Sequence, residues 1–493
     1  MEANSHSGRL FKGLSIQTIV TVLMGIMEIS LFSIMSRLLT PIEFGYFAAI
    51  SGVIAIISCI SEAGLGASII QRKGATYEFI STAFTLSCIL GFAGSLFIFL
   101  FSTNIAQYIA DKTISTPLKI MSVIVLLNSA ISALNAILYK SFKFKRIGIL
   151  QIISYFITGT IGVILALRGF GLYSIIAYNT LYLFLLCILL LCNISKRPKF
   201  MIDKNEVLPI IRYGGWLTFG TFINNITSQI DKLFLGRWIS VSALGLYNRP
   251  AGFITTITGK INSIFDTVLF PVLSDFQDDK DKILEVFYRA ISILNSFSVV
   301  LATIFFLNAE LVVRIFFGSE WIHIVPIMRI LSISVVFNID SRLVDCFFRS
   351  LNLVKYGTYI RVLSLIITFI LMFIGSHLGI MGVACGFIVA YTLITILKII
   401  VLCKLINGDL FKMFIYWLRA WRPIIPILLL GAMFYLFNFS SLTSLLIFAF
   451  LHFCIIIFEF IFCPQCVSKQ YTEYVYPKIY NITNKLMSWI KKK

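Results

Sequence analysis

Charged side chains within long apolar segments are the residues of this sequence that could do chemistry. An ionised group at the centre of a bilayer costs about 2.5–3.5 kcal/mol even on a lenient insertion scale, so each should face a partner or a cavity. Most of these side chains lie in the second half of the chain. The main candidates are Glu28, Glu62, Asp231, Lys232, Arg249, Lys260, Asp266, Asp340, Arg342, Asp345 and Arg361.

One predicted helix carries a cationic polar stripe. Arg249, Thr256 and Lys260 recur at spacings that place them on one face of a helix, and Ser263 continues that face. At 1.5 Å rise per residue the stripe is about 20 Å long. Lys260 has no acidic residue one turn away on this helix. We therefore predict that Arg249, Thr256 and Lys260 bind an anionic ligand.

The preceding predicted helix carries a similar stripe, which includes Asn225 and Lys232. The two helices form a hairpin, and Asp231 and Arg249 lie equally far from its turn, so they could lie at one depth in a membrane. A salt bridge that only locks the hairpin is the alternative to a binding role for this pair. With Arg342, Asn225 and Lys232 complete the predicted binding set.

Carboxylates on polar helix faces are candidates for ion coupling. Glu28 shares a face with Thr21, and Glu62 shares one with Ser58. A buried carboxylate can take up and release a proton, which coupling to an ion gradient requires. We predict that Glu28, Glu62 and Asp231 couple a proton or a sodium ion, with pairing to a neighbouring cation as the alternative.

Missing motifs limit the chemistry further. The nucleotide-binding pattern G-x-x-x-x-G-K-[ST] does not occur, since Gly259 and Lys260 are followed by Ile261. The four histidines show no metal-ligand spacing. No predicted outward loop is long enough for a soluble catalytic face. We expect no metal, no cofactor and no enzymatic activity.

The elements that position these residues are membrane helices. Of 493 residues, 59% are hydrophobic and only 13% are charged, which is typical of an integral membrane protein. Apolar runs of about 20 residues, the length that crosses a bilayer, follow one another along the chain. The fold class predicted is all-α integral membrane with about fourteen transmembrane helices, at about 15–37, 44–70, 80–103, 117–139, 147–167, 172–193, 210–236, 246–271, 285–307, 322–348, 356–376, 380–403, 423–439 and 442–463.

Lysine and arginine alternate strongly between the two sets of connecting loops. Short loops rich in these residues stay in the cytoplasm, and both termini belong to the rich set. We predict that both termini are cytoplasmic and that topology explains the net charge of +19, so no nucleic-acid partner is expected. The rich loops contain Arg72, Lys73, Lys140, Lys143, Lys145, Arg146, Lys196, Arg197, Lys199, Lys204, Lys280, Lys282, Arg349, Lys355, Lys404, Lys412, Arg419 and Arg422.

The chain also repeats itself. The segment from Arg37 to Tyr46 returns 200 residues later, with arginine and glycine in the same places at Arg237 and Gly245. Even numbers of helices give the two repeats the same orientation, around an axis along the membrane normal. The predicted organisation is two parallel six-helix bundles around a central cavity, followed by a helix pair. The predicted segments are a bundle at 15–193, a cytoplasmic linker at 194–209, a bundle at 210–403, the helix pair at 423–463 and a basic cytoplasmic tail at 464–493.

Several segments together resemble a known family. They run from Arg37 to Tyr46, from Gly64 to Arg72, from Asp231 to Arg237 and from Ala243 to Arg249. In this order and spacing they are similar to the polysaccharide transporter family, which includes Wzx-type lipid-linked oligosaccharide flippases. That family lies within the multidrug/oligosaccharidyl-lipid/polysaccharide exporter superfamily. The resemblance covers about residues 15 to 403.

The resemblance implies a multi-pass protein of the bacterial inner membrane. It would flip undecaprenyl-diphosphate-linked oligosaccharide for polysaccharide export, by alternating access of its two bundles. Its partners would be the lipid-linked oligosaccharide, membrane lipids, a coupling cation, and polysaccharide polymerase and assembly proteins. A cationic, hydroxyl-rich helix face suits the diphosphate, since charge-assisted hydrogen bonds replace lost hydration.

Two other functions compete with this one. The first is a small-molecule efflux antiporter of the same superfamily. A cavity for organic cations should favour acids and aromatic residues over the cations of the helix 246–271. The second is a membrane polysaccharide polymerase or glycosyltransferase, which would require a large outward loop or clustered catalytic carboxylates.

Overall fold

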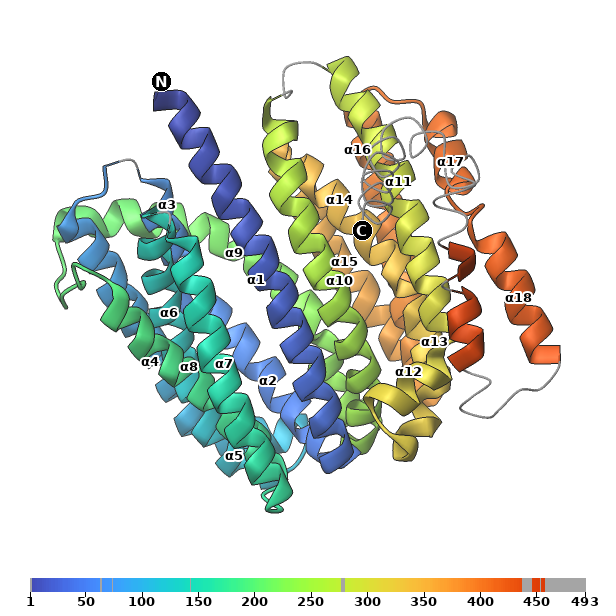
Figure 1. The fold of residues 1–493 in the computed structure, drawn as a ribbon. Helices are drawn as coiled ribbons and strands as arrows, with labels where there is room; N and C mark the ends of the chain where they lie inside the picture. The colour runs from blue at the N-terminus through green and yellow to red at the C-terminus, as the bar shows by residue number, and fades with distance from the viewer. Residues whose placement is uncertain are drawn as a thin grey trace, which may run out of the picture. The chain divides into compact units, whose positions relative to one another are not determined.

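The computed structural model describes residues 2–436 apart from 63, 73, 142 and 276–279, and residues 446–456 apart from 453. Every regular element within these residues is a helix (Figure 1). The chain divides into two compact units, Met1–Gly252 and Phe253–Lys493, called unit 1 and unit 2 below. The helix α10, Val241–Asp275, begins in unit 1 and continues into unit 2.

The remaining helices divide between the units. Those of unit 1 are α1 Glu2–Leu38, α2 Pro41–Glu62, α3 Leu65–Gln71, α4 Tyr77–Ile109, η1 Lys112–Ile114, α5 Ser115–Met121, α6 Val123–Lys140, α7 Phe144–Leu167, α8 Leu172–Asn193 and α9 Lys204–Trp238. Those of unit 2 are α11 Lys280–Leu307, α12 Ala309–Phe316, η2 Ser319–Ile324, α13 Val325–Ser332, α14 Ser334–Ser350, α15 Val354–Ser376, α16 Gly379–Leu405, α17 Leu410–Arg419 and α18 Ile424–Leu436.

Ten helical segments of the described residues are long and apolar enough to cross a membrane. They are α1, α2, α4, the η1–α5–α6 segment, α7, α8, α11, the η2–α13–α14 segment, α15 and α16. The pair α17 and α18, bent by 44°, would make an eleventh span. The helices α9 and α10 are not among these spans, and both carry charged residues at the predicted membrane depth. The chain is therefore a multi-pass membrane protein, and the count of fourteen stays a prediction.

The structure divides or adds to several of the predicted helices; the predicted helix 322–348, for example, consists of η2, α13 and α14. The predicted helix 44–70 is interrupted, because Gly64 adopts a left-handed conformation with φ of 61° between α2 and α3. A further helix, α17, lies in the predicted loop after 403. The side chain of Asp409 starts it by accepting hydrogen bonds from the backbone N–H groups of Phe411 and Lys412, at 2.8 and 3.2 Å.

The C-terminal part of the prediction is only partly covered by the structure. α18 confirms a helix at the start of the predicted pair 423–463, and a shorter apolar helix follows at Leu446–Ile456. The predicted tail 464–493 lies outside the described residues. The units divide at Gly252, whereas the repeat divides the bundles earlier. The repeat-based organisation stays a prediction.

Two repeat-related helix starts touch within unit 1. A Cβ on Gly45 would overlap the carbonyl oxygen of Val241, and a Cβ on Gly245 would overlap the carbonyl oxygen of Pro41. Each helix start therefore packs its glycine against the backbone of the other. The equivalent glycines that define the repeat are the residues that let α2 and α10 approach so closely.

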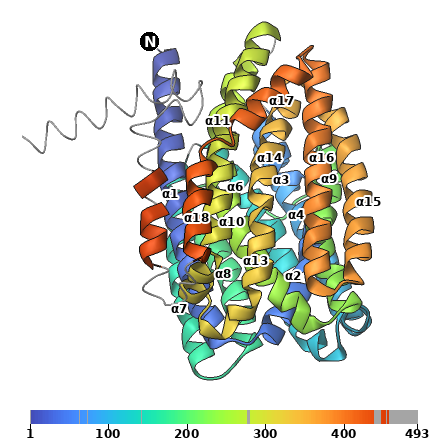
Figure 2. The same ribbon diagram turned by 90° about the vertical axis from the view of Figure 1, so that its right-hand side faces the viewer.

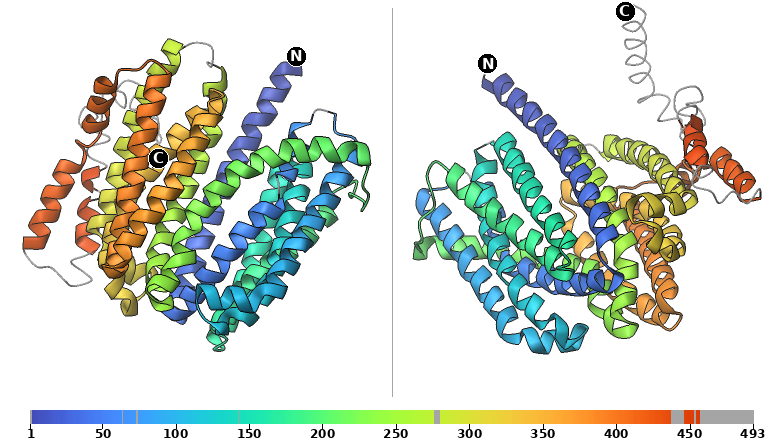
Figure 3. Two further views of the ribbon diagram at one scale, coloured as in Figure 1. Left: turned by 180° about the vertical axis from the view of Figure 1, so that it is seen from behind. Right: turned by 60° about the horizontal axis from the view of Figure 1, so that its bottom comes forward.

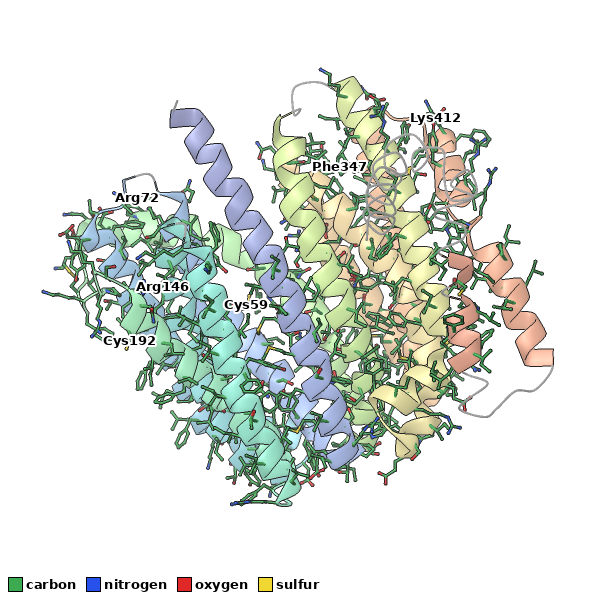
Figure 4. All side chains as sticks on the ribbon, viewed as in Figure 1. Cys59, Arg72, Arg146, Cys192, Phe347 and Lys412 are labelled. Carbon is green, nitrogen blue, oxygen red and sulfur yellow. The ribbon has the colours of Figure 1, made fainter. Side chains whose placement is uncertain are left out.

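The helix α9 is held along one end of unit 1 before it turns down beside α2 (Figure 3). Glu206, near the start of α9, forms an ion pair with Arg72. In this pair Nη2 of Arg72 donates a hydrogen bond to Oε1 of Glu206 at 3.0 Å. The Lys140 ammonium donates to the carbonyl oxygens of Ile69 and Arg72, at 2.8 and 2.6 Å. These bonds join α3, α6 and α9 at the end of unit 1 where Figure 4 labels Arg72.

In unit 2, α14 lies between α11 and α16 (Figure 2). α17 packs against α11 and α16. The hydroxyl of Tyr288 on α11 accepts a hydrogen bond from the backbone N–H of Asp409 at 2.8 Å and donates to its carbonyl oxygen at 3.1 Å. Lys412 lies over the same tyrosine ring at 5.5 Å. α17 is thereby fixed to the bundle although it follows a connecting segment.

Candidate functional site

Arg249 is buried in unit 1 and is held by α1 and α2. Only 7% of it is exposed. Its Nη2 donates to the hydroxyl of Ser36 at 2.7 Å and to the carbonyl oxygen of Phe32 at 3.1 Å. The guanidinium lies over the rings of Phe32 and Phe44, at 3.8 and 3.4 Å from their centroids. Aromatic faces and two acceptors together replace part of the hydration that this cation loses, while its Nε is buried without a hydrogen-bond partner among the described residues.

The predicted alternative for Arg249, an ion pair with Asp231, does not form among the described residues. Asp231 instead accepts a hydrogen bond from the backbone N–H of Lys232 at 2.8 Å, and it lies within electrostatic range of Tyr247. Equal sequence distance from the hairpin turn was thus a poor guide to contact. The side chain of Arg249 turns toward α1 and α2.

Glu28 on α1 lies near a group of tyrosines. Its carboxylate lies within electrostatic range of Tyr155 on α7 and of Tyr178 and Tyr182 on α8. Tyr178 is also within range of Arg249. Unit 1 therefore brings one predicted coupling residue and one predicted binding residue to the same group of phenol side chains.

The other predicted residues of unit 1 lie along α2 and α9. Asn225 donates from Nδ2 to the Cys59 sulfur at 3.2 Å and to the carbonyl oxygen of Thr221 at 3.0 Å. Lys232 packs with its Cβ close to the backbone of α2 and is half-buried. Glu62, at the end of α2, is half-buried and lies near Cys59. Asn225 and Lys232 thus lie in the contact between α2 and α9, apart from the contacts of Arg249.

The predicted binding residues of unit 2 are partly accessible. Thr256 and Lys260 on α10 are half-buried, and Ser263, one turn beyond Lys260, is exposed. The hydroxyl of Ser263 donates to the carbonyl oxygen of Lys260 at 2.8 Å. Arg342 on α14 is exposed, and it lies near Tyr391 of α16. The cationic face predicted for α10 thus remains in part open.

Unit 2 also contains a buried ion pair that the sequence reasoning missed. The Lys398 ammonium on α16 donates to both carboxylate oxygens of Asp345 at 2.9 Å and to the hydroxyl of Ser341 at 2.9 Å. Both partners are at least nine-tenths buried. Lys398 stands in an apolar run, so the need to pair a lysine inside a span could have identified it.

An apolar pocket of about 480 Å³ opens in unit 1 between α2, α4 and α9. Arg237 lies beside it, with its guanidinium 5.0 Å from the ring centroid of Tyr108 and Nη1 donating to the carbonyl oxygen of that residue at 3.2 Å. The lining suits hydrocarbon rather than sugar. It is formed by Val53, Ile56, Ile57, Phe97, Phe101, Asn104, Ile105, Tyr108, Ile109 and Leu233.

Comparison with known proteins identifies the family to which this chain belongs. Residues 34–326, more than half of the chain, match the family described as polysaccharide biosynthesis protein. The chain belongs to this polysaccharide biosynthesis family. The resemblance inferred from Arg37 to Tyr46 and from the later segments is therefore confirmed.

Several proteins similar to this chain are named for polysaccharide biosynthesis or transport. The lipopolysaccharide biosynthesis protein WzxC of Escherichia coli K12 is 26% identical over 83% of each chain. The succinoglycan biosynthesis transport protein ExoT of Rhizobium meliloti is 24% identical over 61% of each chain. The teichuronic acid biosynthesis protein TuaB of Bacillus subtilis is 24% identical over 67% of this chain and 68% of its own.

Solved structures show which fold this family member has. The lipid II flippase MurJ, in an inward closed conformation, covers 92% of this chain and 99% of its own with a TM-score of 0.70 and 16% identity. An inward-facing multidrug resistance MATE transporter of the MOP superfamily covers 79% and 98%, with a TM-score of 0.65 and 14% identity. The predicted all-α membrane transporter fold is confirmed.

Proposed function

We propose that this protein flips a lipid-linked oligosaccharide across the bacterial inner membrane during polysaccharide export. The observation that carries the proposal is the match to a polysaccharide biosynthesis family, together with relatives that are named for polysaccharide biosynthesis and transport. The fold supports transport, because flippases and drug transporters share it. The fold alone does not choose between these substrates.

The substrate class follows from charge. A saccharide carried on a lipid diphosphate presents an anionic head group, and the half-buried Lys260 and the exposed Arg342 supply cations to meet it. Thr256 adds a hydroxyl on the face of Lys260. Lys232 and Asn225 provide similar groups in unit 1. A cavity for organic cations would favour acids at these positions, which weighs against drug efflux.

Arg249 has a narrower place in the proposal. In the present structure its guanidinium is enclosed by Ser36, Phe32 and Phe44. It can reach a substrate only when those contacts break. We assign it to a conformation that opens during alternating access, whereas Lys260 on α10 is half-buried in the present structure.

Ion coupling is assigned to Glu28, Glu62 and Asp231, with a proton or sodium ion as the driving cation. Glu28 lies near the phenol side chains of Tyr155 and Tyr182. Both termini are assigned to the cytoplasm, and polymerase and assembly proteins are the expected partners for the exported chain.

The test is accumulation of lipid-linked oligosaccharide on the cytoplasmic leaflet of cells that depend on this protein for export. Lys260→Arg should retain most transport because it keeps the charge. Lys260→Glu should reduce export at least tenfold, since it repels the diphosphate. Amounts are normalised to inserted protein.

The matched control is Lys145→Glu, the same charge reversal at an exposed position in the first turn of α7. It should export normally. Normal export by Lys260→Glu would remove this face from the substrate path. Failure of the unaltered protein to export any lipid-linked saccharide would overturn the function itself.

A further inference from the structure

Asp340 on α14 is completely buried in unit 2. Its exposed fraction is 0%. Its Oδ2 accepts a hydrogen bond from Nδ2 of Asn295 on α11 at 2.6 Å and another from Nε1 of Trp417 on α17 at 2.9 Å. Three helices therefore converge on one oxygen of one carboxyl group.

The second oxygen of this carboxyl group has no donor. Among the described residues, Asp340 Oδ1 is buried without a hydrogen-bond partner, and so is Oδ1 of Asn295. Both atoms are acceptors, and they belong to two side chains that are already hydrogen-bonded to each other. Buried acceptors are normally satisfied, so two of them in one contact pair require an explanation.

The same helix provides a direct comparison. Asp345 lies five residues further along α14, and its charge is balanced by Lys398. Asp340 has no cation among its contacts within the described residues, because only the amide and the indole reach it. A buried carboxylate without a counter-charge is strongly unfavourable, and such a group is usually neutralised by a proton.

None of the charged groups on the described helices around Asp340 makes a hydrogen bond or ion pair with it; its donors are Asn295 and Trp417. On α16, Lys398 binds Asp345, and Tyr391 lies near Arg342 and Asp345. On α11, the Tyr288 hydroxyl is bonded to the backbone at the start of α17.

On the other two helices that pack against α14, α13 carries Arg329 and α15 carries Arg361, and both arginines are half-buried. Neither one makes a contact with Asp340 in the described part of unit 2.

We propose that Asp340 is a proton-binding site, in which a proton on Oδ1 is donated to the Oδ1 atom of Asn295. An acid and an amide then pair through two hydrogen bonds: the amide N–H to the carboxyl oxygen and the carboxyl O–H to the amide oxygen. One proton satisfies both unpartnered atoms and removes the buried charge. Release of that proton leaves the carboxylate with the Asn295 amide and the Trp417 indole as its donors.

The site fits a proton better than a metal cation. A hard cation requires several oxygen ligands to replace its water, and this pair offers two unpartnered oxygens. The role of the site rests on the proposed function, since Asp340 would add a proton-binding carboxyl group to the coupling residues already assigned. The binding of the proton itself does not rest on that function and can be measured separately.

The hydrogen bond from Trp417 connects the protonation of Asp340 to the helix α17. Trp417 belongs to α17. The centroid of its ring lies 6.5 Å from that of Phe337 on α14 and 5.1 Å from that of Trp421. Loss or gain of the proton on Asp340 changes the acceptor that the indole N–H meets. The state of the site should therefore be transmitted to α17.

The experiment is infrared difference spectroscopy of the purified full-length protein between alkaline and acidic buffer. A protonated carboxyl group gives a C=O stretching band that a carboxylate lacks. We expect one band that is lost in Asp340→Asn and kept in Glu28→Gln and Glu62→Gln. Trp417→Phe should keep the band but displace its pH midpoint upward, because the carboxylate loses one donor.

Persistence of every band in Asp340→Asn would overturn the proposal. Removal of the Asp340 band by added sodium at constant pH would also overturn it, because the site would then bind the metal cation. If Asp340→Asn does not fold, the Trp417→Phe shift decides, and an unchanged midpoint counts against the site. If the band behaves as expected in a protein that flips nothing, the proposed function fails while the proton site stands.

Discussion

At the scale of single residues, the Lys398–Asp345 pair shows what a buried charge requires in this protein. Each partner compensates the buried charge of the other, and the Ser341 hydroxyl accepts a third hydrogen bond from the ammonium. Removal of one partner leaves an uncompensated charge, whereas replacement of both by apolar residues does not. The pair is thus expected to matter through its balance rather than through its attraction.

We expect Lys398→Met alone to destabilise the folded protein by about 3–5 kcal/mol. The double variant Lys398→Met with Asp345→Leu should recover most of this loss. Thermal unfolding of the purified protein in detergent measures both. Equal losses in the single and double variants would show that the contact with Ser341 or packing, and not charge balance, sets the cost.

The matched control is the Glu285–Arg289 pair on α11, which is one turn apart and largely exposed, with 55% and 32% of the side chains accessible. Glu285→Ala should cost about 0.2–1 kcal/mol, because solvent screens an exposed pair.

At the scale of elements, the contact between the starts of α2 and α10 depends on glycine. Gly45 faces the carbonyl oxygen of Val241, and Gly245 faces that of Pro41. These are backbone atoms, so they cannot rotate away from an added methyl group. A substitution must push the two helices apart.

We expect Gly245→Ala to destabilise the protein by about 1–3 kcal/mol, as overpacking usually does. Gly259→Ala lies on the same helix with nothing within 4 Å of an added Cβ, so it should be neutral or stabilising. Thermal unfolding compares the two variants. A loss of the same size in both would mean that α10 requires glycine for a reason other than this contact.

At the scale of the whole molecule, the distribution of lysine and arginine sets the expected orientation. Lys143 lies in the loop between α6 and α7, and Lys145 and Arg146 lie in the first turn of α7, while the loop after α7 carries Arg168 alone. Positive charge keeps the first loop on the cytoplasmic side. Part of this charge also builds structure, since Lys140 and Arg72 bind backbone and carboxylate groups at that end of unit 1.

We expect Arg146→Cys to be protected from a membrane-impermeant thiol reagent in intact cells and labelled after permeabilisation. Arg168→Cys should be labelled in intact cells. Both variants are made in a background without the native cysteines, and their labelling is compared at equal amounts of inserted protein. The reverse pattern would invert the assigned orientation.

Composition and local patterns were enough for much of this architecture. Runs of about 20 apolar residues predict spanning helices because every backbone polar group must be satisfied inside the segment. The repeat of Gly45 at Gly245 indicated two related halves, and the segments around it indicated the family. Such features are local, so they can be read before any residue is placed in space.

Pairing between distant helices was decided only by the tertiary structure. The sequence predicted that Arg249 contacts Asp231 or a ligand. In the structure it contacts Ser36 and two aromatic rings. The sequence predicted no partner for Asp340, whose donors come from positions 45 and 77 residues away. Helical periodicity states which face a side chain occupies, but not which helix lies opposite that face. That choice depends on how all the helices pack together.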